Sequence, residues 1–138
     1  MQGRTSQARE EIEIRLFGCS VGNLASLTRG NPKAARLWVL ISRNYADQLL
    51  SLRGTARSLG VSQDHLNRAL CKASGFTFKQ LLIRVRLLAA LELVWREPET
   101  RREEIALRVG FSTLSAFQKQ CRQKMPGRFP TRRIKQRK

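Results

Sequence analysis

The sequence has few of the residues from which catalytic and metal sites are built. Its 138 residues include one histidine and only 10 acidic side chains. Since it shows no paired carboxylates in an apolar setting, no glycine-rich phosphate loop and no metal-ligand cluster, an enzyme is the least favoured class. We expect no cofactor and no metal. The three cysteines are widely spaced and form no Cys-x-x-Cys pair, which argues against a disulfide scaffold.

Long apolar runs and aromatic side chains are also scarce. No apolar run approaches the ~18 residues of a membrane span, and the charged N-terminal segment lacks the apolar core of a secretory signal. Aromatic residues make up 7% of the chain and fall mostly at positions expected to be buried. Recognition of single-stranded RNA favours exposed aromatics on a sheet, so the pattern argues against it. We expect a cytoplasmic protein with no membrane partner and no small-molecule site in this chain.

Positive charge is what the sequence has in excess. Lys and Arg number 27, for a net charge of +17, while hydrophobic residues make up 41%, a normal share for a globular chain. The excess lies in residues 31–138, and five basic side chains stand in residues 131–138. A polyanion is therefore the first partner to consider. The basic tail is either a solvated, frayed end or an arm that contacts phosphates.

Residues 1–30 have a pattern that differs from the rest of the chain. Ile12, Ile14 and Leu16 alternate with charged residues, a period of two that predicts a short strand. Glycines then follow at short intervals. Because one short strand is not stable alone, we expect this segment to be either a mobile leader or the stub of a larger upstream domain.

From residue 31 onward the pattern predicts helices only. Capping residues and glycine or proline stops bound each apolar stretch. The first helix is strongly apolar, which indicates either core packing or a face for a protein partner. The all-α fold then has about seven helices: 31–50, 51–59, 62–74, 78–96, 101–109, 114–124 and a short one opening at 130–131. The expected caps are Asn31, Ser51, Ser62, Thr77, Thr100 and Thr113.

Two segments, 55–62 and 105–112, repeat one pattern 50 residues apart. In each, an alanine lies four residues before a glycine, Gly60 or Gly110, and apolar residues flank that glycine. A helix-turn-helix needs these features, because alanine allows close crossing and glycine takes a turn with positive φ. Two helical hairpins without a DNA role are the alternative. The strong positive charge favours DNA binding.

These motifs resemble a known family. Gly60-Val61-Ser62-x-x-His65-Leu66-x-Arg68 and the later Leu82-x-Arg84-x-Arg86-Leu87 are similar to the first half of the AraC/XylS-family DNA-binding domain. Residues 104–117, Glu-Ile-Ala-Leu-Arg-Val-Gly-Phe-Ser-Thr-Leu-Ser-x-Phe, resemble its second half closely. The match covers about residues 35–134. Cys121 stands where the family usually has a large aromatic residue, and the usual tyrosine after the last recognition helix is missing.

The resemblance implies two helix-turn-helix subdomains joined by a long central helix. It also implies a transcription regulator, usually an activator, with two recognition helices in successive major grooves of double-stranded DNA. RNA polymerase is then an expected partner, and the nucleoid the expected location. The alternatives are dependence on a protein co-activator or chaperone, and nonspecific nucleic-acid binding. After the segment 1–30, the expected divisions are a first unit 31–77, a linker helix 78–97, and a second unit with its basic tail, 98–138.

The first recognition helix is expected to follow Ser62. Arg68 can bond to guanine through both ends of its guanidinium, and Asn67 can pair with adenine. Asp64 can accept from cytosine or hold Arg68, although acidic and polar residues in a first turn also simply suit the helix dipole. His65 is expected to pack or to contact phosphate. With Leu66 and Leu70 facing the core, the outward side chains are Gln63, Asp64, Asn67 and Arg68.

The second recognition helix is expected to follow Thr113. Gln118 and Lys119 are its expected base or phosphate contacts, and Leu114 can meet a thymine methyl group. Because this face has fewer strong hydrogen-bond donors than the first, we expect it to recognise sequence less sharply. With Phe117 and Cys121 facing the core, the outward side chains are Leu114, Ser115, Gln118 and Lys119.

Overall fold

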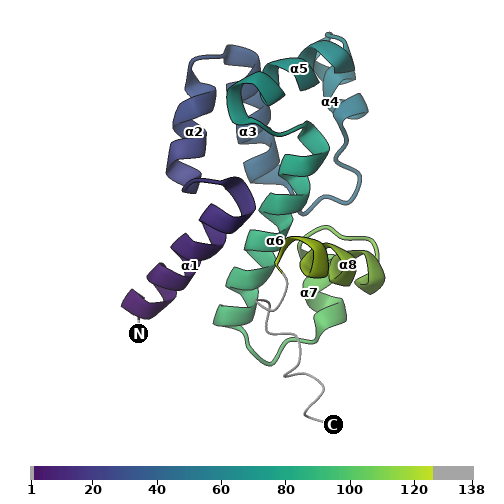
Figure 1. Ribbon diagram of the computed structural model, residues 1–138. Coiled ribbons are helices and arrows are strands. Elements are labelled where there is room, and N and C mark those ends of the chain that lie inside the picture. The colour runs from purple at the N-terminus through teal and green to yellow at the C-terminus, as the bar shows by residue number, and fades with distance from the viewer. Residues whose placement is uncertain (1, 126–138) are drawn as a thin grey trace.

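The computed structural model describes residues 2–125, and this part of the chain is entirely helical (Figure 1). The predicted all-α fold is confirmed. The expected helix at 130–131 lies outside the described residues. The eight helices in the described part are α1 (Gln2–Phe17), α2 (Val21–Arg29), α3 (Pro32–Asn44), α4 (Leu52–Leu59), α5 (Gln63–Ser74), α6 (Phe78–Arg96), α7 (Arg102–Arg108) and α8 (Leu114–Lys124).

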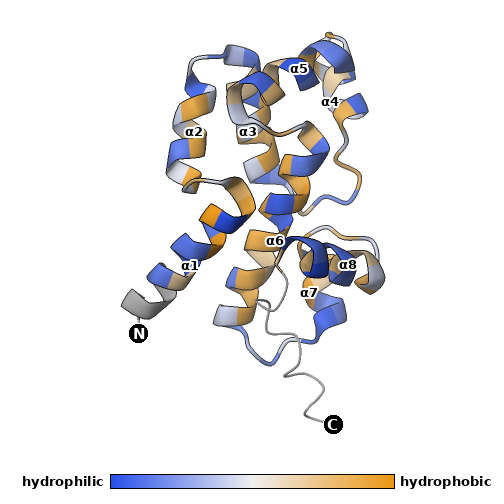
Figure 2. Cartoon of the chain, viewed as in Figure 1, coloured by the Kyte–Doolittle hydropathy of each residue, from blue (hydrophilic) through white to orange (hydrophobic). Residues whose placement is uncertain are grey.

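Helix α6 is the long central element and joins two groups of helices. In the first group, α3 packs on α2 and α5, and α4 packs on α5. In the second group, α7 and α8 pack on each other and on α6 further along its length (Figure 1). Buried residues lie on several sides of α6 because both groups cover it, and Figure 2 shows hydrophobic residues along much of this helix. This is the predicted arrangement of two helix-turn-helix subdomains on a central helix.

The predicted strand near residue 14 is wrong, because residues 2–17 form helix α1. Ile12 and Leu16 stand four residues apart, so a helix puts both on one face, where they are 5% and 2% exposed. Ile14 points away and is 57% exposed. Ile12 and Leu16 therefore belong to one buried stripe of a helix, and the alternation of apolar and charged residues around them does not reflect a strand. Gly18, with φ of +78°, follows the end of this helix.

Helix α1 is attached to the first group by polar and aromatic contacts. The Arg84 guanidinium on α6 donates to the Leu16 carbonyl at 2.8 Å and lies 4.8 Å from the centre of the Phe76 ring. The Phe17 ring meets Phe76 edge-on at 6.4 Å. The buried Glu13 carboxylate accepts from the Val21 amide at 2.8 Å, which joins α1 to the start of α2. Both N-terminal helices thus belong to the packed body of the protein.

Two predicted helix boundaries also need correction. The first predicted helix, 31–50, is shorter in the structure, where α3 ends at Asn44. The residues that follow, 45–50, form turn hydrogen bonds instead of helical ones. The Asp47 amide donates to the Asn44 carbonyl, and the Leu49 amide donates to the Asp47 side chain. Thr100 is not the cap of α7. That helix begins after Arg101 without a side-chain cap, while the Thr100 hydroxyl donates to Glu97.

Candidate nucleic-acid interface

The first helix-turn-helix is α4, a tight turn at Gly60, and α5. Gly60 has φ of +71°, and the Val61 amide donates back to the Ala56 carbonyl at 3.1 Å. Ser62 then caps α5 by accepting from the His65 amide. Ala56 is 3% exposed, so its small side chain lies inside the crossing of the two helices. Together these residues fix the crossing angle between α4 and α5.

The second helix-turn-helix is α7, a turn at Gly110, and α8. Gly110 has φ of +106°, and the Phe111 amide donates to the Ala106 carbonyl at 2.9 Å. Thr113 caps α8 by accepting from the Ala116 amide. The Phe111 ring packs 5.4 Å from the Phe117 ring beneath α8. The two units therefore repeat one local construction, with a capped helix after a glycine turn.

Helix α5 presents Gln63, Asp64 and Arg68 to solvent. Its opposite side is anchored by Leu66 and Leu70, which are fully buried. The Arg68 guanidinium donates to the Asp64 carboxylate at 3.1 Å, one helical turn away. Both side chains stay mostly exposed, so this ion pair orients the guanidinium and contributes little to stability.

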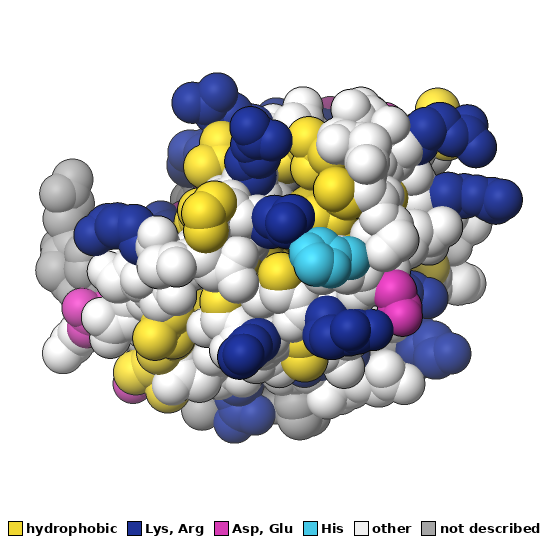
Figure 3. Space-filling view, turned by 90° about the horizontal axis from the view of Figure 1, so that it is seen from above, with side chains coloured by type: hydrophobic (Ala, Val, Ile, Leu, Met, Phe, Trp, Pro, Cys, Tyr) yellow, Lys and Arg dark blue, Asp and Glu magenta, His cyan; other side chains and the backbone are white. Residues whose placement is uncertain are grey.

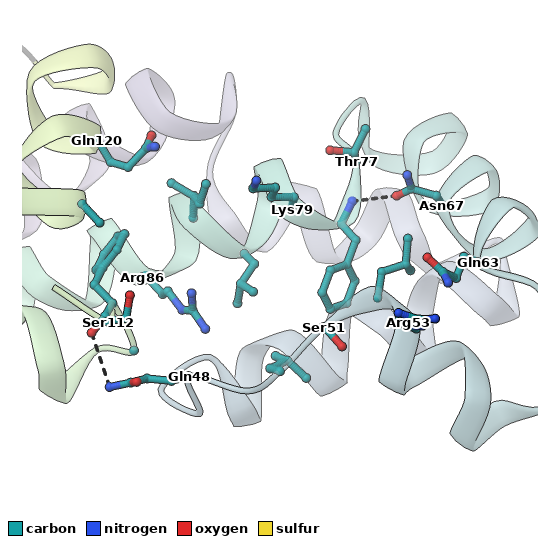
Figure 4. Close-up of a pocket in the computed structure, with 18 residues that line it drawn as sticks. Gln48, Ser51, Arg53, Gln63, Asn67, Thr77, Lys79, Arg86, Ser112 and Gln120 are labelled. Carbon is teal, nitrogen blue, oxygen red and sulfur yellow. Dashed lines mark hydrogen bonds between the residues drawn. The ribbon is translucent and has the colours of Figure 1, made fainter.

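Asn67 lies on the side of α5 that faces α6. Its Oδ1 accepts a hydrogen bond from the Phe78 amide at 2.8 Å, so it bonds a free amide in the first turn of α6 (Figure 4). The sequence pattern predicted Asn67 as a base-contacting residue. That prediction stays a prediction: the acceptor of Asn67 is occupied inside the protein, since the first turn of any helix leaves amides without partners, while this bond does not use its Nδ2 donors.

Helix α8 presents Ser115 and Lys119 to solvent, over the buried Phe117 and Cys121. Leu114 and Gln118, two other predicted contact residues, are half-buried, and Leu114 packs against the core. Burial raises the pKa of the Cys121 thiol to about 12, so this thiol is neutral at physiological pH.

A cleft of about 750 Å³ opens between the two units. Gln63 and Asn67 of α5 line one end, and Gln120 of α8 lines the other (Figure 4). Two exposed cations, Arg53 on α4 and Lys79 on α6, also line it. The sequence pattern does not single out either cation, because only the way the two units face each other brings both to one cleft. Their only signal in the sequence was a cation in the first turn of a helix.

Positive charge is prominent at the end of the molecule that carries α4 and α5. Figure 3 looks down on this end, where Lys and Arg side chains stand around the exposed histidine and acidic side chains are sparse. Electrostatic attraction to a phosphate backbone needs such a surface. The end of the molecule that carries α4 and α5 is therefore suited to nucleic acid in charge.

Within the described residues, no helix is both long and apolar enough to cross a membrane. The same part of the chain contains no group of three or more His, Cys, Asp or Glu side chains that could hold a metal ion.

Comparison with known proteins agrees with this geometry. Residues 55–132 match a family model described as a helix-turn-helix domain. The structure is similar to the C-terminal domain of AraT, a response regulator from Geobacillus stearothermophilus, with a TM-score of 0.70 and 30% identity over 77% of this chain and 88% of that one. It is also similar to the C-terminal domain of the two-component response regulator yesN from Fusobacterium nucleatum, with a TM-score of 0.59 and 25% identity over 64% and 91% of the two chains. A comparison with curated proteins gave no match.

The fold and the matches together define a class, the DNA-binding transcription regulators with a helix-turn-helix, which are not enzymes. Within that class, the chain belongs to the AraC family and carries its DNA-binding domain of two helix-turn-helix units. The family resemblance found in the sequence motifs is confirmed.

Proposed function

We propose that this protein recognises a specific double-stranded DNA sequence with α5 and α8 in successive major grooves. The observation that carries the proposal is that two capped helices, each following a glycine turn, present polar faces on either side of one cleft. Helix α6, which joins the units, has 19 residues and is ~28 Å long at 1.5 Å per residue. One turn of DNA is ~34 Å. We therefore expect mild bending of the DNA toward the protein.

The two half-sites are unequal in this proposal. Arg68, held by Asp64, can donate two parallel bonds to one guanine, which discriminates bases well. Gln63 adds a donor and an acceptor beside it. The exposed side chains of α8 are Ser115 and the flexible point charge of Lys119. The half-site under α5 is then sharply defined and the half-site under α8 is tolerant, while Leu114 and Gln118 remain candidate contacts on the flanks of α8.

Arg53 and Lys79 contact the phosphates between the two half-sites in this arrangement. Both line the cleft that separates the recognition helices, and both are exposed. A duplex held by α5 and α8 passes over this cleft with the backbone between the two major grooves facing it. Cations at this place add affinity without sequence preference, because phosphates are the same at every position.

The role as an activator, with RNA polymerase as a partner at the nucleoid, is also part of the proposal and rests on the family resemblance. A protein co-activator has less support, because Leu37 and Ile41 of the apolar helix α3 are fully buried in the core. Val39, at 46% exposure, is the large apolar side chain of α3 that faces solvent.

Selection of bound duplexes from a random pool tests the proposal directly. We expect one consensus with two half-sites about one DNA turn apart, the first sharper than the second. Binding to the selected duplex should weaken with salt at a log–log slope of about −5 to −7, for roughly 6–8 neutralised phosphates. A pool that shows no enriched sequence, with the same salt slope, would indicate nonspecific nucleic-acid binding. A slope near zero would rule out binding to duplex DNA.

A further inference from the structure

The two units touch at a second place besides α6, and one side chain occupies the centre of that contact. Arg86 projects from α6 and is 9% exposed. Its Nε donates to the Tyr45 carbonyl at 2.7 Å, and its Nη2 donates to the Asp47 carbonyl at 3.0 Å. Its guanidinium carbon lies 5.9 Å from the centre of the Phe111 ring. One guanidinium thus contacts the α3–α4 loop of the first unit and the α7–α8 turn of the second.

Two neighbouring residues complete this contact, which we call the Arg86 junction: Arg86, Tyr45, Asp47, Gln48, Gly110 and Phe111. A Cβ at Gly110 would lie 2.5 Å from the Tyr45 carbonyl oxygen and 2.6 Å from Arg86 Nε. The turn therefore approaches the loop as closely as glycine permits. Gln48 Nε2 also donates to the Phe111 carbonyl at 3.5 Å, a long bond that crosses between the units (Figure 4).

The junction lies close to both recognition helices along the chain. The α3–α4 loop runs directly into α4, which packs on α5. The turn at Gly110 is followed after three residues by α8. Helix α6 fixes the separation of the units along its own axis, but a contact on one side of that helix is needed to fix their rotation around it. The Arg86 junction supplies that contact, and Arg86 also lines the cleft.

We propose that Arg86 is a positioning residue that sets the spacing between α5 and α8, and with it the half-site spacing that the protein accepts. This inference rests on the proposed function. Arg86 acts through Tyr45, Asp47 and Phe111 without touching DNA. Its planar fork holds two carbonyls and stacks on a ring at once, which a lysine cannot do. Arg86→Lys keeps the charge and removes that geometry.

The first test measures the spacing of the helices without DNA. Spin labels are placed on Cys71 of α5 and on Ser115→Cys of α8, in a Cys19→Ser background, and the distance distribution between them is recorded. Cys121 stays in place because its thiol is buried and protonated, and therefore does not react with the label. We expect a narrow distribution for the unmodified junction and a broader one for Arg86→Lys. The matched control is Arg84→Lys, two residues away on α6, where the guanidinium bonds to α1 and not to the second unit. A distribution as narrow in Arg86→Lys as in the control would overturn the inference.

The second test measures the spacing that the protein accepts on DNA. Each variant is titrated with the selected duplex and with versions that carry one base pair more or fewer between the half-sites. Loss of one charge-assisted hydrogen bond corresponds to about a tenfold change in an equilibrium constant, so we expect Arg86→Lys to lower the preference for the best spacing about tenfold. The Arg84→Lys control should keep the original preference.

The outcomes of the two tests separate the inference from the proposed function. Failure of the unmodified protein to select a duplex contradicts the proposed function, while the label distances still test the junction. An unchanged spacing preference in Arg86→Lys, or an equal loss of affinity at every spacing, overturns the inference and leaves the proposed function standing. Should Arg86→Lys not fold, the exposed Gln48→Ala variant, which removes the other bond across the junction, takes its place in both tests with the same contradicting outcomes.

Discussion

Alanine at each of the two turn glycines separates backbone strain from the Arg86 junction. Gly60 has φ of +71°, and an added Cβ there would meet nothing within 4 Å. Gly60→Ala therefore carries only the strain of a left-handed residue, about 1–2 kcal/mol. Gly110 has φ of +106°, and its Cβ would press on the Tyr45 carbonyl and on Arg86. Gly110→Ala carries the same kind of strain and must also move one of these groups.

Moving either group breaks the hydrogen bond between Arg86 and the Tyr45 carbonyl, which measures 2.7 Å. A buried hydrogen bond to a charged group is worth about 1.5–3 kcal/mol. The two contributions predict that Gly110→Ala lowers the free energy of unfolding by about 2.5–5 kcal/mol, against about 1–2 kcal/mol for Gly60→Ala. Gly110→Val should lower the free energy of unfolding further and abolish DNA binding, since a β-branched residue resists positive φ still more.

Urea unfolding followed by circular dichroism measures both variants beside the unmodified protein. The midpoints should fall in the order unmodified, Gly60→Ala, Gly110→Ala, with similar denaturant slopes in all three. Equal losses for the two alanine variants, within about 0.5 kcal/mol, would contradict an added cost from the Arg86 junction. Such a result would mean that the turn at Gly110 moves away from the α3–α4 loop without cost.

Four further changes have expected outcomes. Arg68→Ala should weaken binding to the selected duplex by about 1–3 kcal/mol and relax one base position; full retention of base preference in a substitution scan would show that Arg68 is not a base contact. Asn67→Ala should lower the free energy of unfolding by about 1 kcal/mol, since it frees the Phe78 amide, and an unchanged urea midpoint would contradict that role. Lys79→Ala should weaken binding equally on all duplexes and reduce the salt slope by about 1; a sequence-dependent loss would place Lys79 at a base. Finally, the Cys121 thiol has a pKa of about 12 in the folded protein and near 9 in the unfolded chain. Between these values only the unfolded chain releases the proton, so the free energy of unfolding should fall as pH rises. The fall from pH 8 to 10 should be about 1 kcal/mol smaller in Cys121→Ala, and the same pH dependence in both proteins would contradict the burial of this thiol.

The sequence was sufficient for those elements whose signals are local. Ser62 and Thr113 cap α5 and α8 at the expected positions, because a side chain two or three residues from a free amide needs no tertiary partner. The turns at Gly60 and Gly110 were found in the same way, from glycine placed among apolar residues. The segment around Ile14 was misassigned, since spacings of two and of four both fit Ile12 and Leu16, and only packing against α6 separates them.

The parts of the site that depend on distant residues could not be predicted. Asn67 has the chemistry of a base contact, yet its Oδ1 bonds to Phe78, which lies 11 residues along the chain. Arg86 contacts Tyr45 and Phe111, which belong to opposite units. The pattern of apolar residues along α6 does not predict either contact. A cation on a helix is ordinarily a solvated surface residue. Arg53 and Lys79 therefore become candidate phosphate contacts only once the arrangement of both units is known.

The proposed function requires α5 and α8 to occupy successive major grooves on one face of duplex DNA. Methylation interference on the selected duplex tests this placement, because a methyl group on guanine N7 projects into the major groove. We predict two clusters of interference about 10 base pairs apart, the one under α5 being stronger, and we expect Arg68→Ala to abolish interference at the single guanine that Arg68 contacts. A single cluster, or two clusters on opposite faces of the helix, would contradict it.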